Sequence, residues 1–157
     1  VSFPNANNDV TVLAGSGNDI ISLGLGSDTV TGNGGSDVFE IPNGSSGLTI
    51  GTADTIKDFE STTDKLKLGL LGDGTQDTGN FVESSSSVTN YSDALAQANS
   101  ALGSLNSTST ASELYAFQYD SNYGYLFIDN NSDGLADELI VLVGIESNNI
   151  SATDIIA

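Results

Sequence analysis

Apolar residues recur every nine positions near the start of the chain. Ile21, Val30 and Phe39 stand nine residues apart, each in a short segment bounded by glycine, asparagine or aspartate. Short apolar stretches between turn-forming residues predict short β-strands. One such strand cannot bury its apolar side chain alone, so the spacing predicts strands that stack in successive coils.

Glycine and aspartate follow the same register. Asp19, Asp28 and Asp37 each lie two residues before one of these apolar positions, and Asp9 begins the series one residue out of step. Glycines before each aspartate let the backbone turn and aim its carbonyls inward. Carbonyls and carboxylates together form the oxygen cage that Ca²⁺ prefers. A flexible Gly/Asp-rich linker would need neither the register nor the periodic apolar residues.

The stretch from Ala14 to Glu40 resembles the nonapeptide repeats of the repeats-in-toxin (RTX) family, the hemolysin-type calcium-binding repeats. The resemblance implies a right-handed parallel β-roll, in which six residues form a loop and three form a strand. Successive loops would alternate between two edges of the roll. Calcium ions would lie between loops stacked on one edge, held by backbone carbonyls and by the closing aspartates.

The same resemblance implies particular ligands. On one edge these are the side chains of Asp19 and Asp37 with the carbonyls of Ala14, Ser16, Asn33 and Gly35. On the other edge they are the side chains of Asp9 and Asp28 with the carbonyls of Gly24 and Gly26. The repeat before Asp9 departs from the pattern, because Pro4 occupies its first position.

Residues 54–68 read D-x-I-x-D-F followed by D-K-L-x-L. This pattern is similar to the segment that follows the repeats in RTX proteases, lipases and surface proteins, where it extends the roll into a capping β-sandwich. Asp54 would complete a further calcium site with the loop that ends at Asp28. Asp58 and Asp64 have two open interpretations, as further ligands or as ordinary turn residues.

One helix is predicted at residues 90–102, after a polar, Ser-rich and irregular stretch at 72–90 in which Phe81 and Val82 touch the core. Asn90 or Ser92 would cap the helix, and Gly103 would follow its end. Leu95, Ala98 and Leu102 share one face, which we expect to pack on a sheet. Alternating residues at 114–119 and 123–129 predict two strands joined at 120–122.

The second of these strands leads into a loop that reads D-x-N-x-D-G-x-x-D at residues 129–137. This spacing matches the first nine positions of an EF-hand-type calcium loop. Ile140 stands where the bidentate glutamate would be, and strands at 125–128 and 139–143 replace the flanking helices. A metal site and a plain hairpin turn both remain open. The candidate ligands are Asp129, Asn131, Asp133, the carbonyl of Leu135, and Asp137.

The chain ends in Asp154, Ile155, Ile156 and Ala157. An acidic residue before a few apolar ones resembles the uncleaved signal of type I secretion substrates, which implies export through an ABC transporter. The chain begins with Val-Ser-Phe-Pro and not with methionine. We therefore expect it to be the C-terminal part of a longer, secreted protein.

Composition narrows the possible functions. The net charge is −18, and the three basic residues are Lys57, Lys65 and Lys67, so binding to nucleic acid or to an anionic membrane is disfavoured. The chain contains no histidine or cysteine, which excludes a histidine general base, a Ser-His-Asp or Cys-His nucleophile system and a zinc site of these ligands. No stretch is long and apolar enough for a membrane span.

These observations predict an all-β protein: a right-handed parallel β-roll continuing into a β-sandwich cap, with one short helix. Repeats would occupy residues 1–45 and the capping region residues 46–157, as one continuous domain. We expect a calcium-binding module, not an enzyme, that folds on Ca²⁺ after type I secretion and stabilises or anchors a larger extracellular or cell-surface protein. The alternatives are a module that binds carbohydrate, such as a cell-surface polysaccharide, and an S-layer or adhesin module that anchors by self-association.

Overall fold

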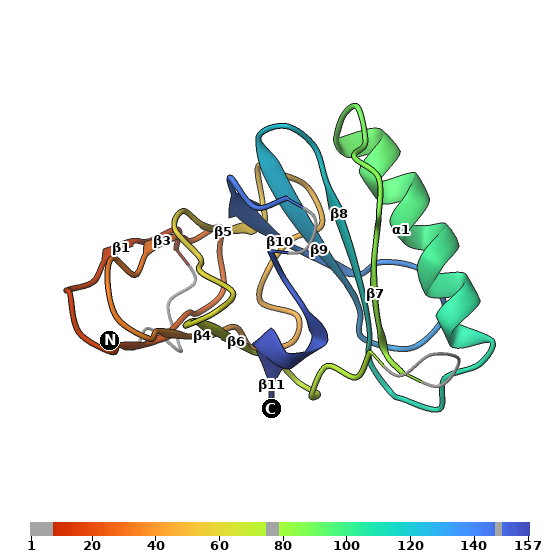
Figure 1. Ribbon diagram of the computed structural model, residues 1–157, viewed down its shortest axis with the longest axis horizontal. Helices are drawn as coiled ribbons and strands as arrows, with labels where there is room; N and C mark the ends of the chain where they lie inside the picture. The colour runs from red at the N-terminus through yellow and green to blue at the C-terminus, as the bar shows by residue number, and fades with distance from the viewer. Residues whose placement is uncertain (1–7, 75–78, 147–148) are drawn as a thin grey trace.

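The computed structural model describes residues 8–74, 79–146 and 149–157. Two sheets form a narrow roll at one end of the molecule, and one of them continues into a broader sheet that carries the helix (Figure 1). The first sheet has the strand order β11-β6-β4-β2 and the second the order β1-β3-β5-β10-β9-β8-β7. The strand bounds are β1 (Thr11–Leu13), β2 (Ile20–Ser22), β3 (Thr29–Thr31), β4 (Val38–Glu40), β5 (Asp54–Ile56), β6 (Lys65–Lys67), β7 (Phe81–Glu83), β8 (Leu114–Tyr119), β9 (Tyr123–Asp129), β10 (Glu138–Val143) and β11 (Ile155–Ile156).

The nine-residue repeat places its strands alternately in the two sheets. Strands β2 and β4 pair in parallel with Ile21 opposite Phe39, and β1 and β3 pair in parallel with Val12 opposite Val30. These four side chains point inward and are at most 6 % exposed. Burying each one contributes about 1.5–3 kcal/mol to the hydrophobic stabilisation. The predicted β-roll is confirmed, and β5 and β6 continue it in the same parallel register.

Strands β10, β9 and β8 of the wide sheet are antiparallel and buried on both faces. Strands β8 and β9 match the predicted ranges, and β10 pairs with β9 on one side and in parallel with β5 on the other. Alternate residues of β10 enter different cores: Ile140 packs with the roll, whereas Val141 packs under the helix. A sheet covered on both faces explains why this strand is a continuous apolar run.

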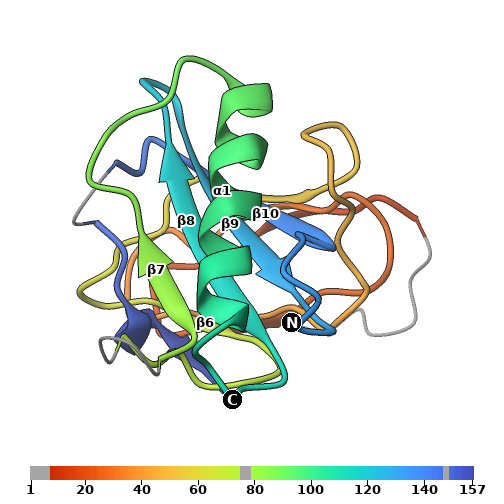
Figure 2. The same ribbon diagram turned by 90° about the vertical axis from the view of Figure 1, so that its right-hand side faces the viewer.

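Helix α1 (Tyr91–Asn106) lies across the outer face of the wide sheet (Figure 2). Its start is as predicted, because the side chain of Asn90 accepts the backbone N–H of Asp93. Its end is not: Gly103 lies inside the helix. The helix continues past Gly103 because Leu105 in its last turn packs against the apolar core beneath the helix. This contact offsets the cost of a glycine within a helix.

The segment 72–90 also differs from the prediction of an irregular stretch. Phe81–Glu83 forms β7, which pairs in parallel with β8. Phe81 and Val82 are half-buried and pack against the cores, as expected. Within the described parts of the chain, no helix has the length and apolar character needed to cross a membrane.

Candidate calcium sites

The closing aspartates of the repeats form one ladder along each edge of the roll. On one edge the backbone N–H of Asp19 donates to Oδ1 of Asp37 over 2.9 Å, and the N–H of Asp37 donates to Oδ1 of Asp64 over 2.9 Å. On the other edge the N–H of Asp28 donates to Oδ1 of Asp54 over 2.8 Å. The structure thus brings Asp19 next to Asp37 and Asp28 next to Asp54, as the resemblance implies, whereas Asp9 meets the loop of Asp28 through Ser27.

Each ladder leaves carboxylate oxygens without a partner. Oδ2 of Asp28, Asp37 and Asp54 is buried and accepts no hydrogen bond from any described residue. These residues are at most 1 % exposed. A buried carboxylate is costly unless it is paired or coordinates a metal. Since oxygen is the ligand that Ca²⁺ prefers, these orphaned atoms fit bound calcium ions, at Asp37 on one edge and at Asp28 and Asp54 on the other.

The pKa values of two ladder aspartates reflect the same lack of positive charge. Burial, together with repulsion from Asp28 and Asp9, raises the pKa of Asp54 to about 7, although the hydrogen bond from the N–H of Asp28 acts to lower it. Burial also raises the pKa of Asp37, with repulsion from Asp64, Asp19 and Asp58 adding to the effect. A divalent cation between the loops would remove this repulsion and favour the charged carboxylates.

Glycine is required where the loops stack. Gly35 has φ 130°, and a Cβ there would lie 2.6 Å from the carbonyl carbon of Gly17 in the loop stacked on it. Gly26 has φ 128°, and its Cβ would lie 3.0 Å from the carbonyl carbon of Asn8. Only glycine combines positive φ with so close an approach of two backbones. These contacts hold the carbonyls of successive loops near one another.

The remaining predicted ligands of the repeats lie in the same loops. Asn33 has φ 65°, and its side chain donates to the carbonyl of Ala14 over 2.6 Å. Ser16 is exposed, and Gly24 is buried. Asp9 is exposed, and its Oδ1 accepts the N–H of Ser27 over 2.8 Å. Pro4, which departs from the repeat pattern, lies outside the described residues. Ligation by these residues and by the ladder aspartates stays a prediction.

The two aspartates with open interpretations both bind backbone N–H groups. Asp58 accepts from Gly32 over 2.9 Å and from Asn33 over 2.7 Å, one bond to each oxygen. Asp64 accepts from Asp37 over 2.9 Å through Oδ1 and from Glu60 over 3.0 Å through Oδ2. These contacts favour the turn-residue interpretation, in which Asp58 and Asp64 tie the loops together as caps.

The loop at 129–137 is ordered by its own side chains. Asp129 accepts the N–H of Gly134 over 2.8 Å, and Asp133 accepts that of Leu135 over 2.9 Å. Asp137 accepts the N–H of Asn130 over 2.9 Å and also binds the side chain of Asn131 over 3.1 Å. This arrangement supplies a hairpin turn without a metal, and metal binding by the loop stays a prediction.

In residues 8–74, 79–146 and 149–157, no group of three or more acidic side chains is gathered as a metal site, so any calcium site on this chain needs carbonyl or hydroxyl ligands as well.

The C-terminal residues are part of the fold. Asp154 is 1 % exposed and forms an ion pair with Lys65 at 2.7 Å. Ile155 is buried in the roll core, and β11 pairs in parallel with β6. In the folded protein this segment is therefore held within the four-stranded sheet.

Comparison with known proteins agrees with this geometry. The family model described as the RTX calcium-binding nonapeptide repeat matches residues 11–39 in four copies. A search of curated protein sequences gives no match. The solution structure of the AlgE6R3 subunit of the mannuronan C5-epimerase from Azotobacter vinelandii is similar, with a TM-score of 0.54 and 17 % identity over 97 % of this chain and 80 % of that chain. Identity this low bears on the fold alone. The chain therefore carries RTX calcium-binding nonapeptide repeats at residues 11–39, which bind Ca²⁺, and has the β-roll fold of such modules.

Proposed function

We propose that the chain is a calcium-dependent folding module of a type I secreted protein, and that it stabilises or anchors a larger extracellular protein without being an enzyme itself. The observation that carries the proposal is the set of orphaned oxygens on Asp28, Asp37 and Asp54, buried in a chain of net charge −18. Such a chain resists compaction until cations neutralise it.

Aspartates, glycines and apolar residues have different roles in the roll. The aspartates offer one oxygen to a backbone N–H of the preceding coil and keep the other for a cation. The glycines allow successive loops to approach within contact distance. Ile21, Val30 and Phe39 form the dry interior. Bound Ca²⁺ supplies the positive charge that the edges lack, so its binding free energy becomes folding free energy.

Because folding depends on calcium, the chain would be unfolded or folded according to the calcium concentration of its compartment. Where calcium is scarce the carboxylates repel one another, and an unfolded chain can pass through a narrow transporter channel. Outside the cell, weak sites with dissociation constants of about 10⁻⁴ to 10⁻³ M would fill. The burial of Asp154 and Ile155 supports this order of events. A transporter can read Asp154, Ile155 and Ile156 as a signal only before β11 has joined the sheet.

A non-enzymatic role is supported by the chemistry of the side chains. The sequence has no histidine or cysteine, and the acidic residues of the roll serve as caps or as candidate ligands. Circular dichroism and thermal melting with Ca²⁺, with a chelator and with excess Mg²⁺ test the proposal. We expect Ca²⁺, but not Mg²⁺, to raise the β-structure content and the melting temperature well above their values in chelator; identical melting curves in Ca²⁺ and in chelator would refute the proposal.

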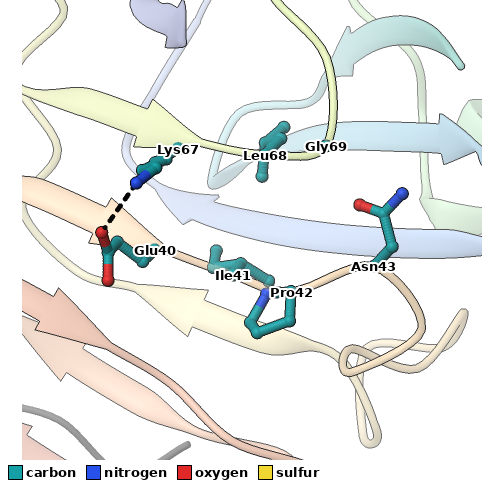
Figure 3. A pocket seen from close by; sticks show the side chains of 7 residues that line it. All are labelled: Glu40, Ile41, Pro42, Asn43, Lys67, Leu68 and Gly69. Carbon is teal, nitrogen blue, oxygen red and sulfur yellow. Dashed lines mark hydrogen bonds and ion pairs between the residues drawn. The ribbon is translucent and has the colours of Figure 1, made fainter. Parts of the chain in front are cut away.

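A second candidate is a polysaccharide-binding module, favoured by the fold shared with a subunit of a mannuronan epimerase. An acidic polysaccharide needs free positive charge. A pocket of about 360 Å³ contains Lys67, but this lysine faces Glu40 at 3.2 Å (Figure 3). Lys65 is held by Asp154. Titration with neutral and acidic glycans separates this candidate from the first, because only a carbohydrate module would give saturable binding.

A surface-anchoring module that self-associates is compatible with the main proposal. Its edge strand β1 has a neighbour on one side only in the described sheets, and an unpaired strand edge can template association. Sedimentation velocity with Ca²⁺ and with chelator would detect calcium-dependent oligomers.

A further inference from the structure

The loop between β4 and β5, residues 42–53, does not follow the nonapeptide pattern. We call it the insert loop. It stands where a Gly-rich hexapeptide would precede Asp54, and it reads P-N-G-S-S-G-L-T-I-G-T-A. Its sequence is that of a plain Gly/Ser-rich loop, because serine in such a stretch carries no distinguishing signal.

Two hydrogen bonds place the insert loop against the ladder at Asp28 and Asp54. The N–H of Asp54 donates to Oγ of Ser46 over 2.8 Å, and Oγ of Ser27 donates to the carbonyl of Ala53 over 3.0 Å. The N–H of Asp28 donates to Oδ1 of Asp54 over 2.8 Å. The insert loop, the repeat loop that ends at Asp28 and the start of β5 therefore meet at one point.

Ser45 directly precedes Ser46 in the insert loop, and its hydroxyl has no partner in the described residues. The residue is 7 % exposed, and its Oγ is buried without a hydrogen-bond partner in the described part of the chain. It lines a cleft of about 390 Å³ between the insert loop and the repeat loop at Gly26 and Ser27. Oδ2 of Asp28 and of Asp54 are also buried and unsatisfied. Both aspartates adjoin this cleft, because Asp28 follows Ser27 and the N–H of Asp54 is bound by Ser46, and both serines line it.

A buried hydroxyl without a partner costs free energy, as does a buried carboxylate oxygen. A hard cation bound to these three oxygens would offset the cost of burying each of them, because it accepts neutral and charged oxygen ligands alike. A water molecule could satisfy the hydroxyl, but it would not neutralise two carboxylates.

We propose that Ser45 supplies a side-chain hydroxyl ligand to the calcium site formed by Asp28 and Asp54, in place of the backbone carbonyls of a missing repeat. This inference rests on the proposed function, because it concerns one site of the same module. The proposed site lies where the roll meets the capping region, and its ligands include two carboxylates and one hydroxyl.

Such a site links the two halves of the fold. The insert loop is bonded to β10, because Oγ of Ser46 donates to the carbonyl of Leu139 over 2.6 Å and the N–H of Leu139 donates to the carbonyl of Gly47 over 3.2 Å. A cation held by Ser45 fixes the loop that borders β10. Calcium at this site therefore orders the capping sheet as well as the roll.

Ser45→Ala tests the inference, with Ser36→Ala as the matched control in an exposed repeat loop. Isothermal titration with Ca²⁺ should show one binding step weakened at least tenfold in Ser45→Ala and unchanged in Ser36→Ala. In chelator, the melting temperature of Ser45→Ala should equal that of the parent chain or exceed it, because the lost hydroxyl satisfied nothing. Amide exchange at Leu139 should be slowed less by Ca²⁺ in Ser45→Ala than in the parent chain.

Unchanged calcium affinity in Ser45→Ala would overturn the inference and leave the proposed function standing. An equal loss of melting temperature with and without Ca²⁺ would also overturn it, because that result assigns Ser45 a purely structural role. Failure of the parent chain itself to bind Ca²⁺ would instead reject the proposed function.

Discussion

Oδ1 of Asp37 accepts the backbone N–H of Asp19 over 2.9 Å, whereas Oδ2 of the same carboxylate is buried and meets no donor in the described residues. The first bond fixes the register of two coils that are eighteen residues apart in sequence. The second oxygen is left for a ligand that the polypeptide does not provide. The same division recurs at Asp28 and Asp54.

Asp37→Asn should separate the metal role from the structural one. Asparagine keeps an acceptor for the N–H of Asp19 but loses the negative charge. We expect the increase of melting temperature produced by Ca²⁺ to shrink, with stability in chelator unchanged or higher because burial raises the pKa of Asp37. Differential scanning calorimetry over a calcium series measures both effects.

Asp58→Asn is the control for that experiment. Both oxygens of Asp58 accept backbone N–H groups, and asparagine can replace only one of these acceptors. The loss should be about 1–3 kcal/mol, equal in Ca²⁺ and in chelator. A loss confined to the calcium-loaded form would make Asp58 a ligand and contradict its assignment as a cap.

Gly35→Ala and Gly34→Ala differ by one position and should differ sharply in effect. A Cβ at Gly35 meets the backbone of Gly17 at 2.6 Å at a φ of 130°, whereas a Cβ at Gly34 meets nothing within 4 Å. Gly35→Ala should cost more than about 2 kcal/mol and weaken calcium binding. Gly34→Ala should be nearly neutral. Urea denaturation in Ca²⁺ measures the difference, and equal effects would mean that the loops do not stack as described.

The metal-free protein should lose stability as pH rises from about 4 to 7. Burial raises the pKa of both Asp54 and Glu138 to about 7. Each group therefore binds a proton in the folded state at a pH where the unfolded chain has released it. The free energy of unfolding should fall by up to about 1.4 kcal/mol per pH unit for each group and level off above pH 7. Chelator-treated samples melted across this range test the slope, and Asp54→Asn should reduce it.

The contact between helix α1 and the loop at 129–137 gives a second matched pair. A Cβ at Gly103 would find only the carbonyl oxygen of Gly134, at 3.9 Å, so Gly103→Ala should stabilise the helix by about 0.5–1 kcal/mol. Gly134 has φ 88°, and its Cβ would lie 3.0 Å from Cα of Gly103. Gly134→Ala should therefore destabilise the protein. Thermal melting of the two variants should give shifts of opposite sign.

Asp154→Asn should destabilise the folded module. Asp154 is buried against Lys65, and its Oδ2 accepts the N–H of Ser151 over 2.8 Å. The loss should be about 1–3 kcal/mol, because asparagine leaves the lysine without a charged partner. Denaturation in Ca²⁺ measures it. An export assay of the same variant in a strain with a type I transporter would separately test the proposed signal.

The sequence by itself determined the elements whose signals are local. The nine-residue register of apolar residues and aspartates placed β2, β3 and β4 and paired Asp19 with Asp37, because one coil of the roll is one repeat. Alternation placed β8 and β9, and the polar Asn90 marked the start of α1. These features depend on neighbours within a few residues or on an exact period, which the chain displays directly.

The tertiary structure alone decided the rest. β7 forms because β8 lies beside it, and α1 passes Gly103 because Leu105 reaches the core. Asp54 and Asp58 look alike in sequence, yet only Asp54 keeps an orphaned oxygen, since two backbone N–H groups happen to face Asp58. Ser45 gave no signal at all. Whether a polar atom is satisfied depends on which groups oppose it across the fold, and that is a property of long-range packing, not of local sequence.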